Sequence, residues 1–316
     1  MSNQSPMAAA AAPSRFPVPT LTAPLRCVVQ SDAQLGEGLV WSVREQVVYW
    51  LDILGCRLYR WDPATGERGQ WRFDEEISAL AERRDAPGLI ITLRRGFALF
   101  DPATDSAPRY LHQPAAELPG NRFNDGKCDA QGRFWGGSMD FDCQLPTGAL
   151  YRYDPDGRCT RHDEGFVVTN GPTWARAEGR ECLYFNDTLS SITWRYDFDA
   201  AAGTVSHKQV WKRFSAEDGL PDGMTTDALG RLWIAHWGGH CVTCHDPETA
   251  EELGRVVLPA SQVTTCAFGG ADLRTLFITT ARVGLTPAQL AAQPLAGSVF
   301  AIEIDSPGVP AHLFGG

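Results

Sequence analysis

The sequence lacks two features that would suggest large partners. No apolar run approaches the roughly 20 residues that a membrane-spanning helix needs. Positive charge is in deficit, since 28 Lys and Arg stand against 38 Asp and Glu, giving a net charge of −10 and a pI near 5.2. Because no basic stripe is visible, we expect no binding to nucleic acid and no attraction to anionic membranes.

The sequence also lacks the signs of a secreted protein. Its nine cysteines are an odd number scattered along the chain, which fits free thiols in a reducing cytoplasm better than a disulfide framework. Residues 1–24 are rich in Ala, Pro and Ser, without the basic start and apolar core of a signal peptide. We therefore expect a disordered leader over residues 1–24, one folded domain over residues 25–316 and a cytoplasmic location.

What the sequence does contain is a repeat. Six segments each end an apolar strand with an aspartate and a turn, and they are LYRWDPATG, ALFDPATD, LYRYDPDG, TWRYDFD, VTCHDPET and FAIEID. A second apolar strand precedes each of them, usually led by a Gly- or Asp-rich turn such as DAQGR or DALGR. Alternating apolar residues with β-branched and aromatic side chains predict strands throughout.

A repeat of about 40 to 50 residues that contains four strands is typical of a β-propeller blade. The sequence therefore predicts an all-β, six-bladed β-propeller. The segment Leu25–Gln30 is expected to close the ring by pairing into the last blade. The best helix candidate is Thr286–Gln293, where Thr286 can cap the start and Pro287 occupies the first turn.

Polar residues recur about one blade apart, where each innermost strand is expected to begin near the central channel. They are Glu37, Ser78, Asn124, Asn170, Asp222 and Thr265. Two are carboxylates and two are carboxamides, and these four stand next to Gly or Asp-Gly, where the backbone can turn tightly. Such oxygen donors suit a hard divalent cation, and the absence of His and Cys at these positions argues against a structural zinc site.

Each of these turns also has an ordinary explanation. Asn-Asp-Gly and Pro-Asp-Gly are common turn sequences, and geometry alone favours Asn or Asp before Gly. Arg122, two residues before Asn124, could pair with a surface carboxylate. The functional interpretation depends on the same register recurring in several blades, and on strand alternation, which points Arg122 and Asn124 to the same side.

The motifs resemble one family. LGEG, RFNDGKCDAQGRFWGGSM, TNGP, CLYFNDT and GLPDGMTTDALGRLWIA occur in the order found in the senescence marker protein, regucalcin and gluconolactonase family. The segment TTARVGLTPAQLAAQPLAGSVF also resembles bacterial sugar lactonases. Leu39 replaces the usual Pro and Ser138 the usual Thr, and neither change removes a ligand.

The resemblance implies a six-bladed propeller with one divalent metal, and it implies which residues bind. The metal ligands would be Glu37, Asn170 and Asp222, and the substrate contacts Arg122 and Asn124. Asp140 is the nearest match to the family's substrate-side carboxylate. Asp222 would take the proton of a water that attacks a metal-polarised lactone carbonyl. Oxygen ligands admit calcium, magnesium, manganese, zinc or ferrous iron.

Two other motifs are set aside. The segment CVTCH (Cys241–His245) matches a haem-attachment pattern, but it falls where the other blades carry a strand. The two histidines of HWGGH (His236–His240) stand in a strand-turn context rather than on a helix. His236 is expected to be a satisfied histidine or to line the channel.

The leading hypothesis is thus a metal-dependent aldonolactone hydrolase whose partner is a small sugar lactone. Three alternatives stay open: a calcium-binding regulatory protein on the same fold, a related esterase or phosphotriesterase, and a propeller scaffold that binds proteins. Arg122 and Asn124 favour the enzyme, because a calcium buffer would not need donors for sugar hydroxyls.

Overall fold

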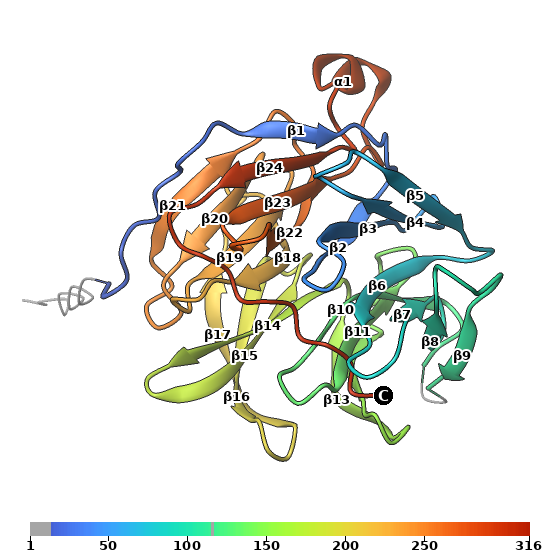
Figure 1. Ribbon diagram of the computed structural model, residues 1–316. Coiled ribbons are helices and arrows are strands. Elements are labelled where there is room, and N and C mark those ends of the chain that lie inside the picture. The colour runs from blue at the N-terminus through green and yellow to red at the C-terminus, as the bar shows by residue number, and fades with distance from the viewer. Residues whose placement is uncertain (1–13, 115–116) are drawn as a thin grey trace, which may run out of the picture.

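The computed structural model describes residues 14–114 and 117–316, which form six four-stranded antiparallel sheets arranged in a ring (Figure 1). Blade one contains β2 (Gly36–Ser42), β3 (Val47–Asp52), β4 (Arg57–Trp61) and β5 (Arg68–Arg72). Blade two contains β6 (Ile77–Glu82), β7 (Leu89–Leu93), β8 (Gly96–Phe100) and β9 (Arg109–His112). Blade three contains β10 (Asn121–Cys128), β11 (Phe134–Asp140), β12 (Gly148–Tyr153) and β13 (Cys159–Phe166).

The remaining blades follow the same order. Blade four contains β14 (Thr169–Ala177), β15 (Arg180–Asp187), β16 (Ile192–Asp199) and β17 (Thr204–Arg213). Blade five contains β18 (Leu220–Thr226), β19 (Leu232–Trp237), β20 (Cys241–His245) and β21 (Glu252–Val257). Blade six contains β22 (Val263–Gly269), β23 (Thr275–Thr280), β24 (Val299–Glu303) and β1 (Arg26–Val29). The predicted six-bladed β-propeller is confirmed.

The ring is closed at both its inner and its outer circumference. The inner strands β2, β6, β10, β14, β18 and β22 contact one another in succession, and β22 contacts β2 again. At the rim, β1 pairs antiparallel with β24, as predicted for Leu25–Gln30. The last blade is therefore built from both ends of the described chain.

Apolar side chains fill the spaces between blades. Each of the six core clusters combines residues of two neighbouring blades, as where Trp135 and Leu150 of blade three meet Leu183 and Phe185 of blade four. Burial falls from axis to rim, since every residue of β2 is buried whereas β5 alternates between exposed and half-buried. The inner strands are thus held rigidly, which positions whatever side chains face the channel.

Five of the six recurring aspartates stand just after the third strand of their blade, whereas Asp197 lies within β16. Asp62 Oδ1 accepts hydrogen bonds from the backbone N–H groups of Ala64 and Thr65, at 2.8 and 3.2 Å, and Asp101 and Asp246 accept equivalent bonds. Such turns satisfy backbone donors where a strand ends. The repeat that revealed the blades is therefore a structural feature and contributes nothing to the channel.

The expected helix is present as α1 (Pro287–Ala292), which projects from blade six (Figure 1). Thr286 caps it in a reciprocal capping box with Gln289. None of the helices among the described residues has the length and apolarity to cross a membrane.

Part of the expected leader lies outside the described residues, namely 1–13. Residues 14–24, however, lie against blades five and six rather than apart from the fold. Ser14 Oγ donates to Asp246 Oδ2 at 2.6 Å, Phe16 packs against the core cluster of blades five and six, and Leu21 forms a bridge with Ile304. Composition alone did not predict these contacts.

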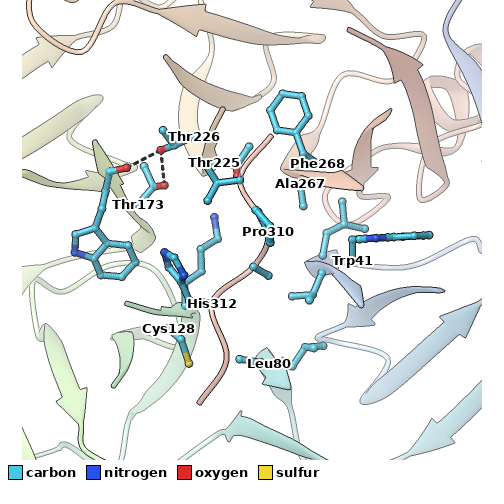
Figure 2. A pocket seen from close by; sticks show the side chains of 17 residues that line it. Trp41, Leu80, Cys128, Thr173, Thr225, Thr226, Ala267, Phe268, Pro310 and His312 are labelled. Atoms are coloured by element: carbon cyan, nitrogen blue, oxygen red, sulfur yellow. Dashed lines mark hydrogen bonds between the residues drawn. The ribbon is translucent and has the colours of Figure 1, made fainter. Parts of the chain in front are cut away.

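The C-terminal segment crosses the ring at one mouth of the channel (Figure 1). Gly308 bridges to Asp227 of blade five, and Phe314 bridges to Arg83 beside blade two and is only 2% exposed. Between them, Pro310 and His312 cover a cavity of about 110 Å³ whose wall includes Trp41 (Figure 2). This mouth lies at the C-terminal ends of the inner strands, whereas the predicted polar ring lies near their N-terminal ends. The polar ring therefore faces the opposite mouth of the channel.

Candidate active site

Each inner strand is interrupted by a β-bulge beside the predicted ring residue. The register shifts fall between Glu37 and Val40, Ile77 and Ala79, Phe123 and Gly126, Asn170 and Thr173, Pro221 and Met224, and Val263 and Cys266. A bulge bends a strand and redirects a side chain. The same irregularity in all six blades explains why residues so far apart in sequence face a common space.

Glycines permit these bulges for two different reasons. Gly38 and Gly171 have φ values of 58° and 80°, a conformation that glycine adopts without strain. Gly223 does not have a positive φ. Instead, a Cβ atom at Gly223 would lie 2.2 Å from Thr265 Oγ1 of the next blade. The prediction that glycine allows a tight turn therefore applies beside Glu37 and Asn170, whereas beside Asp222 glycine allows close approach of two strands.

Five of the six predicted site residues line a single cavity of about 410 Å³, and they are Glu37, Arg122, Asn124, Asn170 and Asp222. Each is at most 6% exposed. Ser78 and Thr265 of the predicted ring are not among the lining residues; Ser78 Oγ is 2.9 Å from Thr92 Oγ1 inside blade two.

A chain of hydrogen bonds orders the polar floor of this cavity. Arg122 Nη1 donates to Asn124 Oδ1 at 2.6 Å and to the Phe123 carbonyl oxygen at 3.0 Å. Asn124 Nδ2 donates to Asn170 Oδ1 at 3.0 Å, and Asn170 Nδ2 donates to Thr188 Oγ1 at 2.8 Å. The surface-pairing alternative for Arg122 is therefore wrong, because its guanidinium is buried among cavity residues.

The carboxylates of the site repel one another. Burial, and then the charge of Asp125, raise the pKa of Glu37 to about 8. Burial, followed by the charges of Glu37 and Asp125, raises the pKa of Asp222 well above its usual value, while Arg122 acts in the opposite direction. Three buried carboxylates thus share two nearby cations, Arg122 and Lys127.

This donor set fits a divalent cation. Ionising Glu37 and Asp222 together is unfavourable in a buried site unless a positive charge lies between them. The Asn170 amide, held by Thr188, adds a neutral oxygen. No group of three or more His, Cys, Asp and Glu side chains suited to a metal occurs in residues 14–114 and 117–316, so the set depends on the asparagine oxygen. Oxygen ligands of mixed charge are typical of calcium and other hard cations.

Asp140 was predicted to contact substrate, but its carboxylate is used elsewhere. Asp140 Oδ2 accepts hydrogen bonds from the backbone N–H groups of Gln144 and Leu145, at 2.8 and 3.0 Å. These bonds lower the pKa of Asp140 and hold the turn after β11. Its neighbours Met139 and Phe141 line the cavity instead. An aspartate that follows a strand is compatible with either role, so the sequence could not distinguish them.

The two motifs that were set aside prove to be structural. CVTCH forms β20, the third strand of blade five, and both of its cysteines are buried. His236 is fully buried and does not line the cavity; its Nε2 is 2.6 Å from Thr243 Oγ1, which also lies 2.8 Å from His245 Nε2. His236 is therefore hydrogen-bonded only through Nε2, because its Nδ1 is buried without a partner among the described residues, and the channel-lining alternative is wrong.

Four residues at or beneath the floor were not singled out from the sequence. Thr188 orients Asn170, and Asn186 Nδ2 donates to the backbone oxygen of Asp222. Asp125 accepts a bond from the Gly171 N–H at 3.0 Å, and Lys127 donates to the Met224 carbonyl oxygen. All four stand within motifs already noted, FNDGK and CLYFNDT, but nothing in a single sequence separates a supporting residue from a turn residue.

The sequence matches the family described as SMP-30/Gluconolactonase/LRE-like region over residues 35–282. The chain belongs to this family. A 6-deoxy-6-sulfogluconolactonase from Pseudomonas putida is 37% identical over 92% of this chain and 99% of the relative. A pentonolactonase, XacC, from Haloferax volcanii is 37% identical over 80% of this chain and 84% of the relative.

A solved structure of this SMP-30/gluconolactonase family has the same architecture. A calcium-binding regucalcin from Agrobacterium tumefaciens matches with a TM-score of 0.85 and 28% identity, over 92% of this chain and 96% of that one. The recognition of the family from its motifs is thus confirmed. The relatives differ in the lactone that their names give.

Proposed function

We propose that this protein is a divalent-metal-dependent hydrolase that opens a sugar lactone to the aldonic acid. One observation carries the proposal: a buried Arg–Asn–Asn chain and two buried carboxylates line the same cavity, in a member of a family whose relatives are named as lactonases. A cavity of about 410 Å³ suits a small molecule rather than a peptide.

Glu37, Asn170 and Asp222 would hold the cation. When bound, a divalent cation would withdraw electron density from the lactone carbonyl and make water more acidic. Asn170 presents its oxygen because its amide nitrogen is bonded to Thr188 Oγ1. Asn186 fixes the backbone of Asp222 through a bond to the Asp222 carbonyl oxygen. These supporting bonds limit the movement of the ligand set.

Arg122 and Asn124 would bind and orient the substrate. The Nη1 atom of Arg122 is occupied by the Asn124 and Phe123 oxygens, which leaves its other N–H groups for the ring oxygen and hydroxyls of the lactone. Asp222 would accept a proton from the attacking water at a carboxylate oxygen. The ring C–O bond then breaks, and the departing oxygen takes up that proton, so water is consumed and a hydroxy acid is formed.

The test is an assay of aldonolactone opening by metal-stripped protein, with calcium, magnesium, manganese, zinc and ferrous ions restored singly. We expect activity to return with at least one cation. Asp222→Ala should reduce kcat/KM by about 100-fold to 10,000-fold, the usual contribution of a general base. Asp101→Asn, in an exposed turn remote from the cavity, is the control. Full activity in metal-stripped protein, or in Asp222→Ala, would contradict the proposal.

Arg122→Ala separates the enzyme from a calcium-binding regulatory protein, the second candidate, which the calcium-binding relative favours. In an enzyme, loss of charged hydrogen bonds should raise KM by roughly 10-fold to 100-fold. In a regulatory protein, calcium binding would occur without turnover of any lactone, ester or phosphotriester. A peptide partner would indicate a scaffold, and turnover of esters or phosphotriesters alone would indicate the related hydrolase.

A further inference from the structure

The mouth of the candidate active site is built from apolar side chains. Leu54, Phe141, Leu189, Trp237 and Val283 line the cavity. They come from five different blades. Trp237 is the last residue of β19, and the other four follow the second strand of their blade within three residues, after β3, β11, β15 and β23 respectively. We call these five residues the apolar wall. The polar residues lie on the inner strands, so the cavity has a polar floor and an apolar entrance.

Blade two completes the ring with an arginine whose side chain is 35% exposed and lies outside the cavity lining. Arg94 follows β7, the equivalent position, but it is not among the cavity-lining residues. Its guanidinium lies 4.7 Å from the centre of the Phe141 ring and 3.8 Å from Glu76. The arginine therefore packs against the Phe141 ring next to the entrance.

The polar groups of the floor are largely occupied. Asn124 uses its oxygen for Arg122 and its nitrogen for Asn170 and the Thr169 carbonyl. Thr188 accepts from Asn170, and Asp140 is turned into its own loop. Once Glu37, Asn170 and Asp222 are assigned to a cation, Arg122 is the main donor left for substrate. Groups that recognise a lactone are thus concentrated at one end of the cavity.

We infer that the preferred substrates are lactones whose carbonyl end is polar and whose distal substituent is apolar, such as deoxy-sugar lactones or alkyl-substituted lactones. This inference rests on the proposed function and specifies its substrate class. A methyl or alkyl group beside the apolar wall is removed from water, which is favourable. A hydroxyl in the same place would lose part of its hydration, and among the five wall residues only Trp237 carries a hydrogen-bond donor.

The experiment compares 6-deoxygalactono-1,4-lactone with galactono-1,4-lactone, which differ by one hydroxyl at the distal carbon. We expect kcat/KM to favour the deoxy lactone by about tenfold or more, the discrimination that one such group produces in an apolar pocket. The double variant L189Q/V283T, which places polar groups in the wall, should reduce the preference to less than about threefold.

Leu229→Gln is the matched control. Leu229 is 48% exposed and Leu189 is 44% exposed, but Leu229 lies in the turn between β18 and β19, outside the cavity lining. Leu229→Gln should retain the wild-type preference.

Equal or better turnover of galactono-1,4-lactone by the wild type would overturn the inference while leaving the proposed function intact. So would a preference that survives L189Q/V283T. Failure of the wild type to open either lactone with any cation would instead refute the proposed function, and the inference with it.

Discussion

The buried ion pair of Asp227 and Arg231 offers the sharpest test of how the propeller is held together. Asp227 Oδ1 accepts from the backbone N–H groups of Leu229 and Arg231, both at 3.0 Å. Its Oδ2 accepts from Arg231 Nε at 2.7 Å and from Trp233 Nε1 at 2.9 Å. Both charged side chains are 0% exposed. The remaining N–H groups of Arg231 reach the Pro17 carbonyl oxygen and Ser306 Oγ, which joins both terminal segments to blade five.

Asp227→Asn keeps the size of the side chain but removes its charge and turns one acceptor into a donor. Arg231 then remains buried as a cation with only neutral acceptors, and the new amide nitrogen faces Arg231 Nε and Trp233 Nε1. Breaking one partner of a buried pair costs about 3–5 kcal/mol. We therefore expect Asp227→Asn to lower the free energy of unfolding by that amount in urea titrations followed by tryptophan fluorescence.

Two other Asp→Asn variants serve as controls for the loss of stability in Asp227→Asn. Asp129→Asn alters the equivalent constellation of blade three, where Arg133 has a 10% exposed side chain and also bonds to the Ala200 carbonyl oxygen at 2.7 Å; its loss should be smaller. Asp101→Asn alters an exposed turn and should stay within about 0.5 kcal/mol of the wild type. A loss below about 1 kcal/mol for Asp227→Asn, or a larger loss for Asp129→Asn, would refute the reasoning.

Three further predictions follow from other buried groups. Phe314→Ala should cost about 3–5 kcal/mol of stability, measured by urea unfolding, because a ring that is 2% exposed leaves a cavity beneath blades two and three; an unchanged midpoint would contradict this. Burial lowers the pKa of both His236 and His245 to about 3, so the stability they contribute is present above pH 6.5 and is lost as pH falls below it. At pH 5 that loss is about 2 kcal/mol per histidine, and H236Q/H245Q should flatten the pH profile of unfolding. Lys127→Met leaves Asp125 without its cation, so the melting temperature of metal-stripped protein should fall while the gain on adding a divalent cation grows; equal gains in variant and wild type would contradict this.

The sequence predicted those parts of the fold that repeat. Blade number, the closing strand and the capped helix follow from patterns that local chemistry dictates. Four of the five cavity residues stand in one register repeated in separate blades, and Arg122 was indicated by the family resemblance. Residues 14–24 and the segment that ends at Phe314 were not predicted, because their contacts depend on surfaces that exist only after the blades have assembled.

Part of the candidate site was predictable from the sequence. The repeated register indicated a polar ring that includes Glu37, Asn170 and Asp222, and the family resemblance indicated that these three are the ligands. Asp140 lies outside the cavity lining and holds a turn, a use that its sequence context did not distinguish from substrate binding. The apolar wall was missed for the opposite reason, since single apolar residues in turns between strands carry no periodic signal.

The pairing of β1 with β24 has a consequence for synthesis of the protein. On the ribosome, β1 emerges before every other strand of the propeller, and β24 emerges after every other strand. Until then β1 is an unpaired edge, open to association with other chains. The individual blades can form as they are translated, but the circumference that brings blades one, three, four, five and six around one cavity is fixed only when the two ends meet. Catalytic competence should therefore arise late and abruptly, and fragments that lack β24 should aggregate rather than show partial activity.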